Sequence, residues 1–420
     1  MPNYETTTIS PKHHEAIVAW QRKNFPELEL LDKNWSKYFG VQIPFALLAK
    51  VGPRRSETID VGRFKGMPKV QRAGDMQGNM FYSARDIVRA QCSTELGSIQ
   101  QHRETLEEAV SDEAKYAVLR IMAEELRHAY QMFWVLDHDP TWKKVGMGDV
   151  AQETIDELLS METGTHVLDA FNIRFGNFLD NSVYASVIDL VGKYQLQMQQ
   201  VFAYEPMARS MGPMLSEEGF HMGSGRRIVA EVAAAAGRGE GSFSMDDIQR
   251  AVNCWYARGL EMFGREDSGA TVISFGFKDK ANGEAQAEYI GEVKGIVRNW
   301  NLSFVTARLP RLDRGAAETL ISEIESTGEV REGIRPEDLV FLPDRHFFRR
   351  RGIAEFLYRP YSVEGEILTE GGKPLSAEAY LGYLAEVLPR HYVGTEDFAR
   401  YRTALLAQDS GDASADPFRG

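Results

Sequence analysis

The sequence predicts an all-α protein built around a four-helix bundle, with an N-terminal and a C-terminal extension. Two observations support this fold class. Residues 84–236 show long stretches of helical pattern separated by short breaks. Within them, a carboxylate followed about thirty residues later by a Glu-x-x-His segment occurs twice. Such spacing suits two up-and-down helix pairs whose polar side chains meet at one level.

The first part of the chain, residues 1–80, is the least regular. Aromatic residues such as Trp20, Trp35 and Phe39 alternate with proline and glycine, and no helical or strand period is sustained. We therefore assign no secondary structure here and expect this N-terminal segment to wrap the bundle.

Residues 81–265 are expected to form the bundle domain. Helix breaks are predicted at residues 137–140 and 204–206, and Pro206 suits the first turn of a helix. Residues 140–180 provide enough chain for a long crossover between two helix pairs. The glycine-rich run at 237–241 ends the last long helix, and Ser244 is positioned to cap the next one.

The rest of the chain divides into an extension and a tail. Residues 266–407 alternate helical pieces with turns rich in proline and glycine, so we expect a mostly helical C-terminal extension. Residues 408–420 are small and polar, as is typical of a flexible tail.

The composition is typical of a globular protein and argues against nucleic-acid and membrane partners. Of 420 residues 43% are hydrophobic, and 48 basic against 61 acidic residues give a net charge of −13. An acidic chain is a poor general binder of nucleic acid. Two cysteines provide no disulfide framework, the N-terminus lacks signal-peptide features, and no apolar run is long enough to span a membrane. We expect a cytoplasmic protein with neither a nucleic-acid nor a membrane partner.

Two Glu-x-x-His segments, Glu125 to His128 and Glu218 to His221, carry the chemistry. Residues three apart share a face of a helix, and both pairs lie within an apolar stripe that should face the core. The stripes are Val118, Ile121, Glu125, His128, Met132 and Val135, and Met211, Met214, Glu218, His221, Gly225, Ile228 and Val232. A core carboxylate is costly unless it is paired or binds a metal, so two such pairs indicate a shared cation.

Two further carboxylates extend the pattern to four helices. Glu95 precedes Glu125 by 30 residues, and Asp189 precedes Glu218 by 29. One carboxylate from each of two helices and Glu-x-x-His from the other two is the ligand pattern of ferritin-like di-iron and di-manganese proteins. The sequence therefore predicts a dinuclear metal site in a ferritin-like bundle. Its ligands are Glu95, Glu125, His128, Asp189, Glu218 and His221.

Each of these choices has an alternative. A single Glu-x-x-His pair is more often an ion pair, and the prediction depends on all six residues agreeing in spacing. Glu205 competes with Asp189 as the fourth carboxylate, but it precedes Pro206, which favours a position at the end of the bundle. Iron is favoured over zinc because the donors are rich in oxygen and lack thiolate, and manganese is the alternative metal.

Five segments and their mutual spacing are familiar from one group of proteins. They are residues 90–95, 124–128, 189–196, 204–209 and 215–221, with fainter similarity at 256–264 and 342–349. The chain resembles the oxygenase component of benzoyl-CoA 2,3-epoxidase, within the wider phenylacetyl-CoA epoxidase family of ferritin-like di-iron proteins. The resemblance covers most of the chain and is weak before residue 80.

The resemblance implies two non-haem irons bound by the six residues, with Gln91 as a catalytic polar residue beside the metals. It implies O2-dependent epoxidation of the aromatic ring of an aryl-CoA thioester such as benzoyl-CoA. Because no flavin or nicotinamide fingerprint is present, electrons are expected from a separate NAD(P)H-dependent reductase carrying flavin and iron–sulfur centres. The protein is expected to be a monomer or a small homo-oligomer.

Other functions would use the same residues. A di-iron hydroxylase or N-oxygenase acting on a different aromatic or acyl substrate needs the same metals. A metal-storing ferritin-like protein is disfavoured by the long C-terminal part, and a metal-free helical scaffold would bind no iron. Arg349 and Arg350, in the dense basic run 345–351, could bind the phosphates of CoA or an acidic partner, and a solvated face is the alternative.

Overall fold

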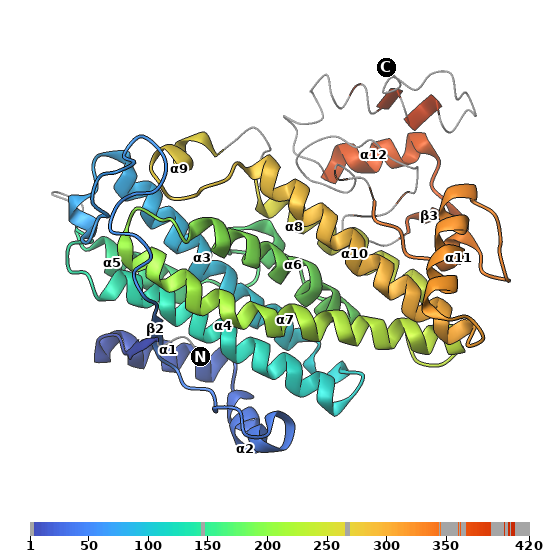
Figure 1. The fold of residues 1–420 in the computed structure, drawn as a ribbon, viewed down its shortest axis with the longest axis horizontal. Coiled ribbons are helices and arrows are strands. Elements are labelled where there is room, and N and C mark those ends of the chain that lie inside the picture. The colour runs from blue at the N-terminus through green and yellow to red at the C-terminus, as the bar shows by residue number, and fades with distance from the viewer. Residues whose placement is uncertain are drawn as a thin grey trace. The chain divides into compact units, whose positions relative to one another are not determined.

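The structure is a computed structural model that describes residues 4–143, 148–264, 269–343 and 367–387, together with 345, 360, 362, 399, 402–403 and 405–407. These residues form a helical bundle, which confirms the predicted all-α class (Figure 1). None of the described helices is both long enough and apolar enough to cross a lipid bilayer.

Four long helices supply the residues of interest. They are α3 (Asn79–Glu104), α4 (Asp112–Asp137), α6 (Phe178–Gln199) and α7 (Glu205–Arg238). The predicted breaks agree with the structure, since α4 ends at Asp137 and α7 begins with Pro206 in its first turn. The start of α4 is fixed by Ser111, whose side chain accepts a hydrogen bond from the backbone N–H of Ala114.

The end of α3 is joined to the start of α6 by a reciprocal pair. His102 Nδ1 lies 2.7 Å from Asn181 Oδ1, and Asn181 Nδ2 donates to the His102 carbonyl at 2.9 Å. Both side chains are buried. Because the C-terminal end of α3 meets the N-terminal end of α6, the two helices are antiparallel.

The N-terminal segment contains two helices and a strand pair. The elements are β1 (Glu5–Thr7), α1 (Pro11–Asn24), α2 (Leu28–Phe39) and β2 (Ala49–Val51). The strands pair antiparallel, with Thr6 opposite Lys50. Strands of three residues have no detectable period, so the sequence did not reveal them.

The remaining elements connect or follow the long helices. Between α4 and α6 lie α5 (Val150–Ser160) and the 3₁₀ turn η3 (Asp169–Asn172), so the expected crossover is partly helical. The others are η1 (Ala73–Asp75), η2 (Leu106–Glu108), α8 (Met245–Met262), α9 (Ala270–Ser274), α10 (Asn282–Arg308), α11 (Arg314–Thr327), η4 (Pro336–Asp338), β3 (Thr369–Glu370), β4 (Lys373–Pro374) and α12 (Ala377–Val387). Ser244 caps α8 as predicted.

The described chain groups into two compact units. The first lies within Met1–Asn181, Asp189–Ser224 and Glu266–Ala285, and the second within Ser182–Ile188, Gly225–Arg265 and Gln286–Gly420. All six predicted metal ligands belong to the first unit. In the second unit Gly225 lets two helix segments approach closely, because a Cβ there would lie 2.6 Å from the Ser182 carbonyl oxygen.

Candidate metal centre

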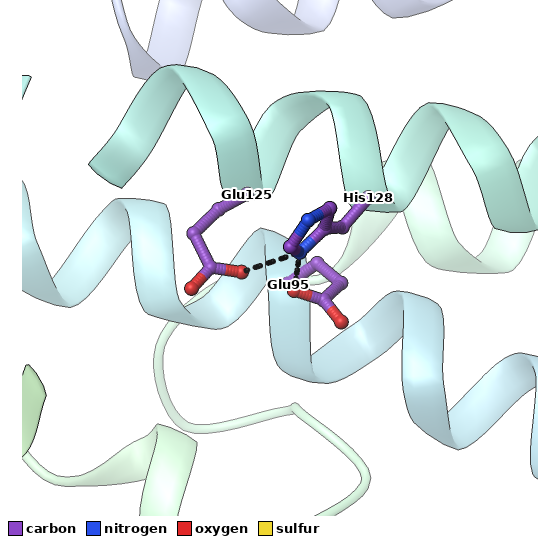
Figure 2. A group of neighbouring side chains, drawn as sticks. All are labelled: Glu95, Glu125 and His128. Carbon is purple, nitrogen blue, oxygen red and sulfur yellow. Dashed lines mark ion pairs between the residues drawn. The ribbon is translucent and has the colours of Figure 1, made fainter. Parts of the chain in front are cut away.

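Glu125 and His128 lie on one face of α4, and both are buried (Figure 2). Glu95 faces them from α3. Its Oε2 is 3.5 Å from His128 Nδ1, and Glu125 Oε2 is 3.8 Å from the same nitrogen. Neither distance is that of a good hydrogen bond. The three side chains therefore converge without bonding His128 Nδ1, and they form the first half of a cluster.

The second half combines Glu218 and His221 of α7 with Asp189 of α6. His221 Nδ1 is 3.6 Å from Glu218 Oε2 and 3.9 Å from Asp189 Oδ2. One glutamate of each half also approaches the imidazole of the other half. Glu125 Oε1 lies 3.5 Å from His221 Nδ1, and Glu218 Oε1 lies 3.7 Å from His128 Nδ1. The structure thus brings all six predicted residues together, with the two imidazole ring centres 5.7 Å apart.

Four buried atoms of this cluster have no hydrogen-bond partner among the described residues: His128 Nδ1, His221 Nδ1, Asp189 Oδ2 and Glu218 Oε2. Buried polar atoms are normally satisfied, so this group requires an explanation. Ligand atoms of Glu95, Glu125 and His128 lie within 4.8 Å of one another, as do those of Glu125, Asp189 and His221. Four carboxylates and two neutral imidazoles would be balanced in charge by two dications. The residues fit a dinuclear site for a metal that accepts oxygen and imidazole donors.

The pKa values show how unfavourable the cluster is without a cation. Burial raises the pKa of Glu125 and Asp189 well above the usual range, and it raises the pKa of Glu218 to about 7. Neighbouring carboxylates add to the rise, since like charges in a buried space disfavour ionisation. A bound dication would favour the ionised form of all of them.

Each imidazole contacts a glutamate on the opposite helix, and sequence reasoning missed both glutamates. Glu217 of α7 lies 3.1 Å from His128 Nε2, and Glu124 of α4 lies 3.1 Å from His221 Nε2. When Nε2 donates to a carboxylate, Nδ1 keeps its lone pair for a metal. A signal was present, because residues 124–128 and 217–221 both read Glu-Glu-x-x-His.

Cations in turn hold these two glutamates. Arg127 Nε donates to Glu217 Oε2 at 2.7 Å, and Lys50 of β2 pairs with the same carboxylate. Although burial opposes it, the Arg127 charge holds the pKa of Glu217 well below its usual range. Arg120 Nε donates to Glu124 Oε1 at 2.9 Å. The strand pair of the N-terminal segment thus contributes to the surroundings of the cluster.

Gln91 also lies beside the cluster. Its Nε2 donates to Glu95 Oε1 from one turn earlier on α3. Such a bond would hold the Glu95 carboxylate in place. Arg349 and Arg350, the predicted substrate contacts, lie outside the described residues.

Glu205, the alternative to Asp189, has a different position. It is the first residue of α7, and its carboxylate accepts hydrogen bonds from Arg54 Nε at 2.8 Å and from Gln71. It is not among the residues whose ligand atoms converge, whereas Asp189 is. Glu205 thus begins the helix rather than lying outside it, and the choice of Asp189 as the fourth carboxylate stays a prediction.

Comparison with known proteins agrees with the resemblance seen in the sequence. The chain is similar to benzoyl-CoA oxygenase component B of Aromatoleum evansii, with 26% identity over 263 residues, which are 58% of this chain and 53% of that protein. The chain therefore spans about half the length of this curated relative. No protein-family model matches the chain.

Proposed function

We propose that this protein is a di-iron monooxygenase with a ferritin-like bundle that epoxidises the aromatic ring of an aryl-CoA thioester such as benzoyl-CoA. The similarity to a benzoyl-CoA oxygenase component supports this substrate class. The observation that carries the proposal is the pair of buried imidazole Nδ1 atoms without partners beside four carboxylates. The relative's name, component B, supports a separate partner component, which we propose is an NAD(P)H-dependent reductase with flavin and iron–sulfur centres.

The residues of the chain have distinct roles in this proposal. Glu95 and His128 would hold one iron and Asp189 and His221 the other, with Glu125 and Glu218 as further ligands of the pair. Two irons bound there would supply the two-electron chemistry with O2 that a monooxygenase needs. The chain itself orients the ligands, through Gln91, Glu124 and Glu217, and excludes water from the buried carboxylates.

The wider organisation stays a prediction. Residues 81–265 would form the metal-binding domain, residues 1–80 would wrap it, and residues 266–407 would extend it. Residues 408–420, the predicted tail, lie outside the described residues. Manganese is the alternative metal, because its preferred ligands are also carboxylates.

Metal content is the first test. Protein expressed with ample iron should hold about two irons per chain, as the ligand set of di-iron carboxylate proteins requires. His221→Gln should lose iron while its helical circular dichroism is retained. His14→Gln is a matched control, because His14 contacts Tyr130 and lies outside the cluster. Stoichiometric zinc without iron would contradict the proposal.

The reaction is the second test. Chemically reduced protein would be mixed with ¹⁸O2 and benzoyl-CoA, phenylacetyl-CoA or free benzoate, and the products analysed by mass spectrometry. An epoxide carrying one ¹⁸O atom, formed from a thioester, supports the proposal. A ring-hydroxylated or N-oxygenated product would instead support the hydroxylase alternative. Oxidation of iron with no organic product would contradict both.

A further inference from the structure

Lys278 is a partly buried ammonium group with no acidic partner in the described part of the chain. It follows α9, and its Nζ donates to Gln195 Oε1 of α6 at 2.6 Å. Among the described residues Gln195 is its one hydrogen-bond partner, and no carboxylate lies within ion-pair distance. Burial lowers the pKa of Lys278 to about 8, so the group remains mostly protonated at neutral pH.

Lys69 shows how a lysine is accommodated elsewhere in the same unit. Its Nζ donates to the carbonyls of Val201 and Phe202 at 2.9 and 3.0 Å, and it lies 3.4 Å from Asp60. An ammonium group has three donors, and Lys69 uses all of them. Lys278 uses one, which leaves two donors for a group from outside the chain.

Lys278 contacts α6 on the C-terminal side of the proposed metal ligand Asp189. Its partner Gln195 follows Asp189 by six residues, which is about 9 Å along a helix axis. Gly192 lies midway between them and is partly exposed, whereas Asp189 and Glu218 are buried. A Cβ added at Gly192 would lie 3.5 Å from Glu218 Oε1, so residue 192 itself places no side chain against this carboxylate.

On α3, which is antiparallel to α6, a partly exposed surface lies at the level of Gly192. His102 and Asn181 join α3 to α6, and Gln91 is eleven residues before His102 just as Gly192 is eleven residues after Asn181. Antiparallel helices rise equally per residue, so Gln91 and Gly192 are level. Around Gln91 a partly exposed stripe at helical spacing leads to Glu95. Its members are Ile87, Ala90, Gln91 and Thr94.

We infer that Lys278 and Gln195 bind the acyl oxygen of the substrate and that the aromatic ring lies against Gly192, directed at the metal cluster. The inference rests on the proposed function and adds the location of the substrate's carbonyl end. The ammonium group supplies a charge-assisted hydrogen bond, and the missing side chain at residue 192 supplies space beside Glu218. The acyl oxygen belongs to a thioester or to a free carboxylate, and these two sources are separable by experiment.

The test is calorimetric binding of three probes to the full-length, iron-loaded protein without O2: benzoyl-CoA, benzoate and free CoA. Lys278→Met should weaken benzoyl-CoA binding about 10- to 100-fold, the usual value of a hydrogen bond to a charged group. Free CoA, which lacks the acyl oxygen, should bind unchanged. If benzoate binding is weakened by the same factor, the contact needs only the acyl oxygen. If only benzoyl-CoA binding is weakened, the contact is with the thioester.

Two further variants complete the design. Lys33→Met removes the same charge from a lysine on α2 whose side chain is 74% exposed, and it should bind all probes as the wild type does. Gly192→Leu should keep its iron and lose benzoyl-CoA binding, because the added side chain occupies the space beside Glu218. Equal affinities of wild type and Lys278→Met for every probe would overturn the inference. An equal loss of affinity for free CoA would also overturn the inference, because Lys278 would then contact the CoA phosphates. Wild-type protein that binds neither acyl probe would refute the proposed function itself.

Discussion

At the scale of single residues, the two imidazoles have unequal surroundings. Glu217, which faces His128, is held by both Arg127 and Lys50. Glu124, which faces His221, is held by Arg120 from its own helix. More positive charge on a carboxylate makes it a weaker acceptor for the imidazole N–H, so the two metal positions should differ in ligand basicity.

Glu217→Gln tests the role of this carboxylate. The amide keeps the shape but loses the charge, so His128 is held less firmly and Arg127 loses its anion. We expect the dissociation constant of one of two metal ions to rise about 10- to 100-fold. Anaerobic titration with Co²⁺, followed by its absorption bands, measures this. Glu231→Gln is the control, because Glu231 is on the same helix, is 57% exposed and pairs with Arg227. Equal affinities in both variants would contradict the assignment.

Asp189→Asn should weaken metal binding but make the metal-free protein more stable. Asp189 Oδ2 is buried without a hydrogen-bond partner, and burial raises its pKa, so its charge destabilises the metal-free protein. We expect lower iron content together with a free energy of unfolding about 1 to 3 kcal/mol higher in the metal-free state. Glu205→Gln should do the reverse, keeping both irons and losing stability, because Glu205 pairs with Arg54. Iron analysis and urea unfolding of chelator-treated protein distinguish the two patterns.

At the scale of elements, α3 depends on a glycine to pack against the crossover connection. A Cβ at Gly97 would lie 2.8 Å from Phe171 Cβ and 3.1 Å from His166 Cδ2. His166 is itself held, with Nε2 3.0 Å from Gln100 Oε1. The crossover therefore fits closely over α3 near Glu95, and it limits how far that helix can shift.

Gly97→Ala should destabilise the protein by about 1 to 3 kcal/mol, the usual cost of overpacking. Gly223→Ala, in α7, is the matched control. Beyond its own helix backbone and chain neighbours, no described residue lies within 4 Å of a Cβ there, so alanine should stabilise the protein by about 0.4 to 1 kcal/mol through the unfolded state. The measurement is urea unfolding followed by circular dichroism. Stabilisation by both substitutions would show that the contact at Gly97 relaxes freely.

At the scale of the whole molecule, acid stability should depend on a buried histidine. Burial lowers the pKa of His102 to about 4, below its usual value of 6.5. Between these two pH values the unfolded chain binds a proton that the folded chain does not, so stability is lost as the pH falls from 6.5 towards 4. The loss is about 1.4 kcal/mol per pH unit.

His102→Gln removes this dependence. At pH 7.5 the variant should be the less stable protein, because it alters the bond to Asn181. As the pH falls to 5, the wild type should lose about 2 kcal/mol more than the variant. Urea unfolding of the metal-free proteins at pH 7.5, 6 and 5 measures the difference. A constant difference across this range would mean that His102 titrates normally.

Several features could be read from the sequence because they depend on near neighbours in the chain. Apolar period, helix caps and proline positions predicted the all-α class, the end of α4 at Asp137 and the start of α7 at Glu205. The two Glu-x-x-His segments and the thirty-residue spacing together singled out six residues that the structure brings together. Repeated spacing is informative here because helices of similar length place equivalent residues at one level.

Other features depend on which segments become neighbours, and tertiary structure alone decided them. Glu217 contacts His128 and Glu124 contacts His221 across two helices. The repeated Glu-Glu-x-x-His pattern marks both glutamates, but it does not say which imidazole each of them contacts. The pairing of β1 with β2 places Lys50 on Glu217, and the chain after α9 places Lys278 on Gln195. Local sequence cannot encode such pairs, because a polar side chain is satisfied by whichever group packing brings within about 3 Å of it.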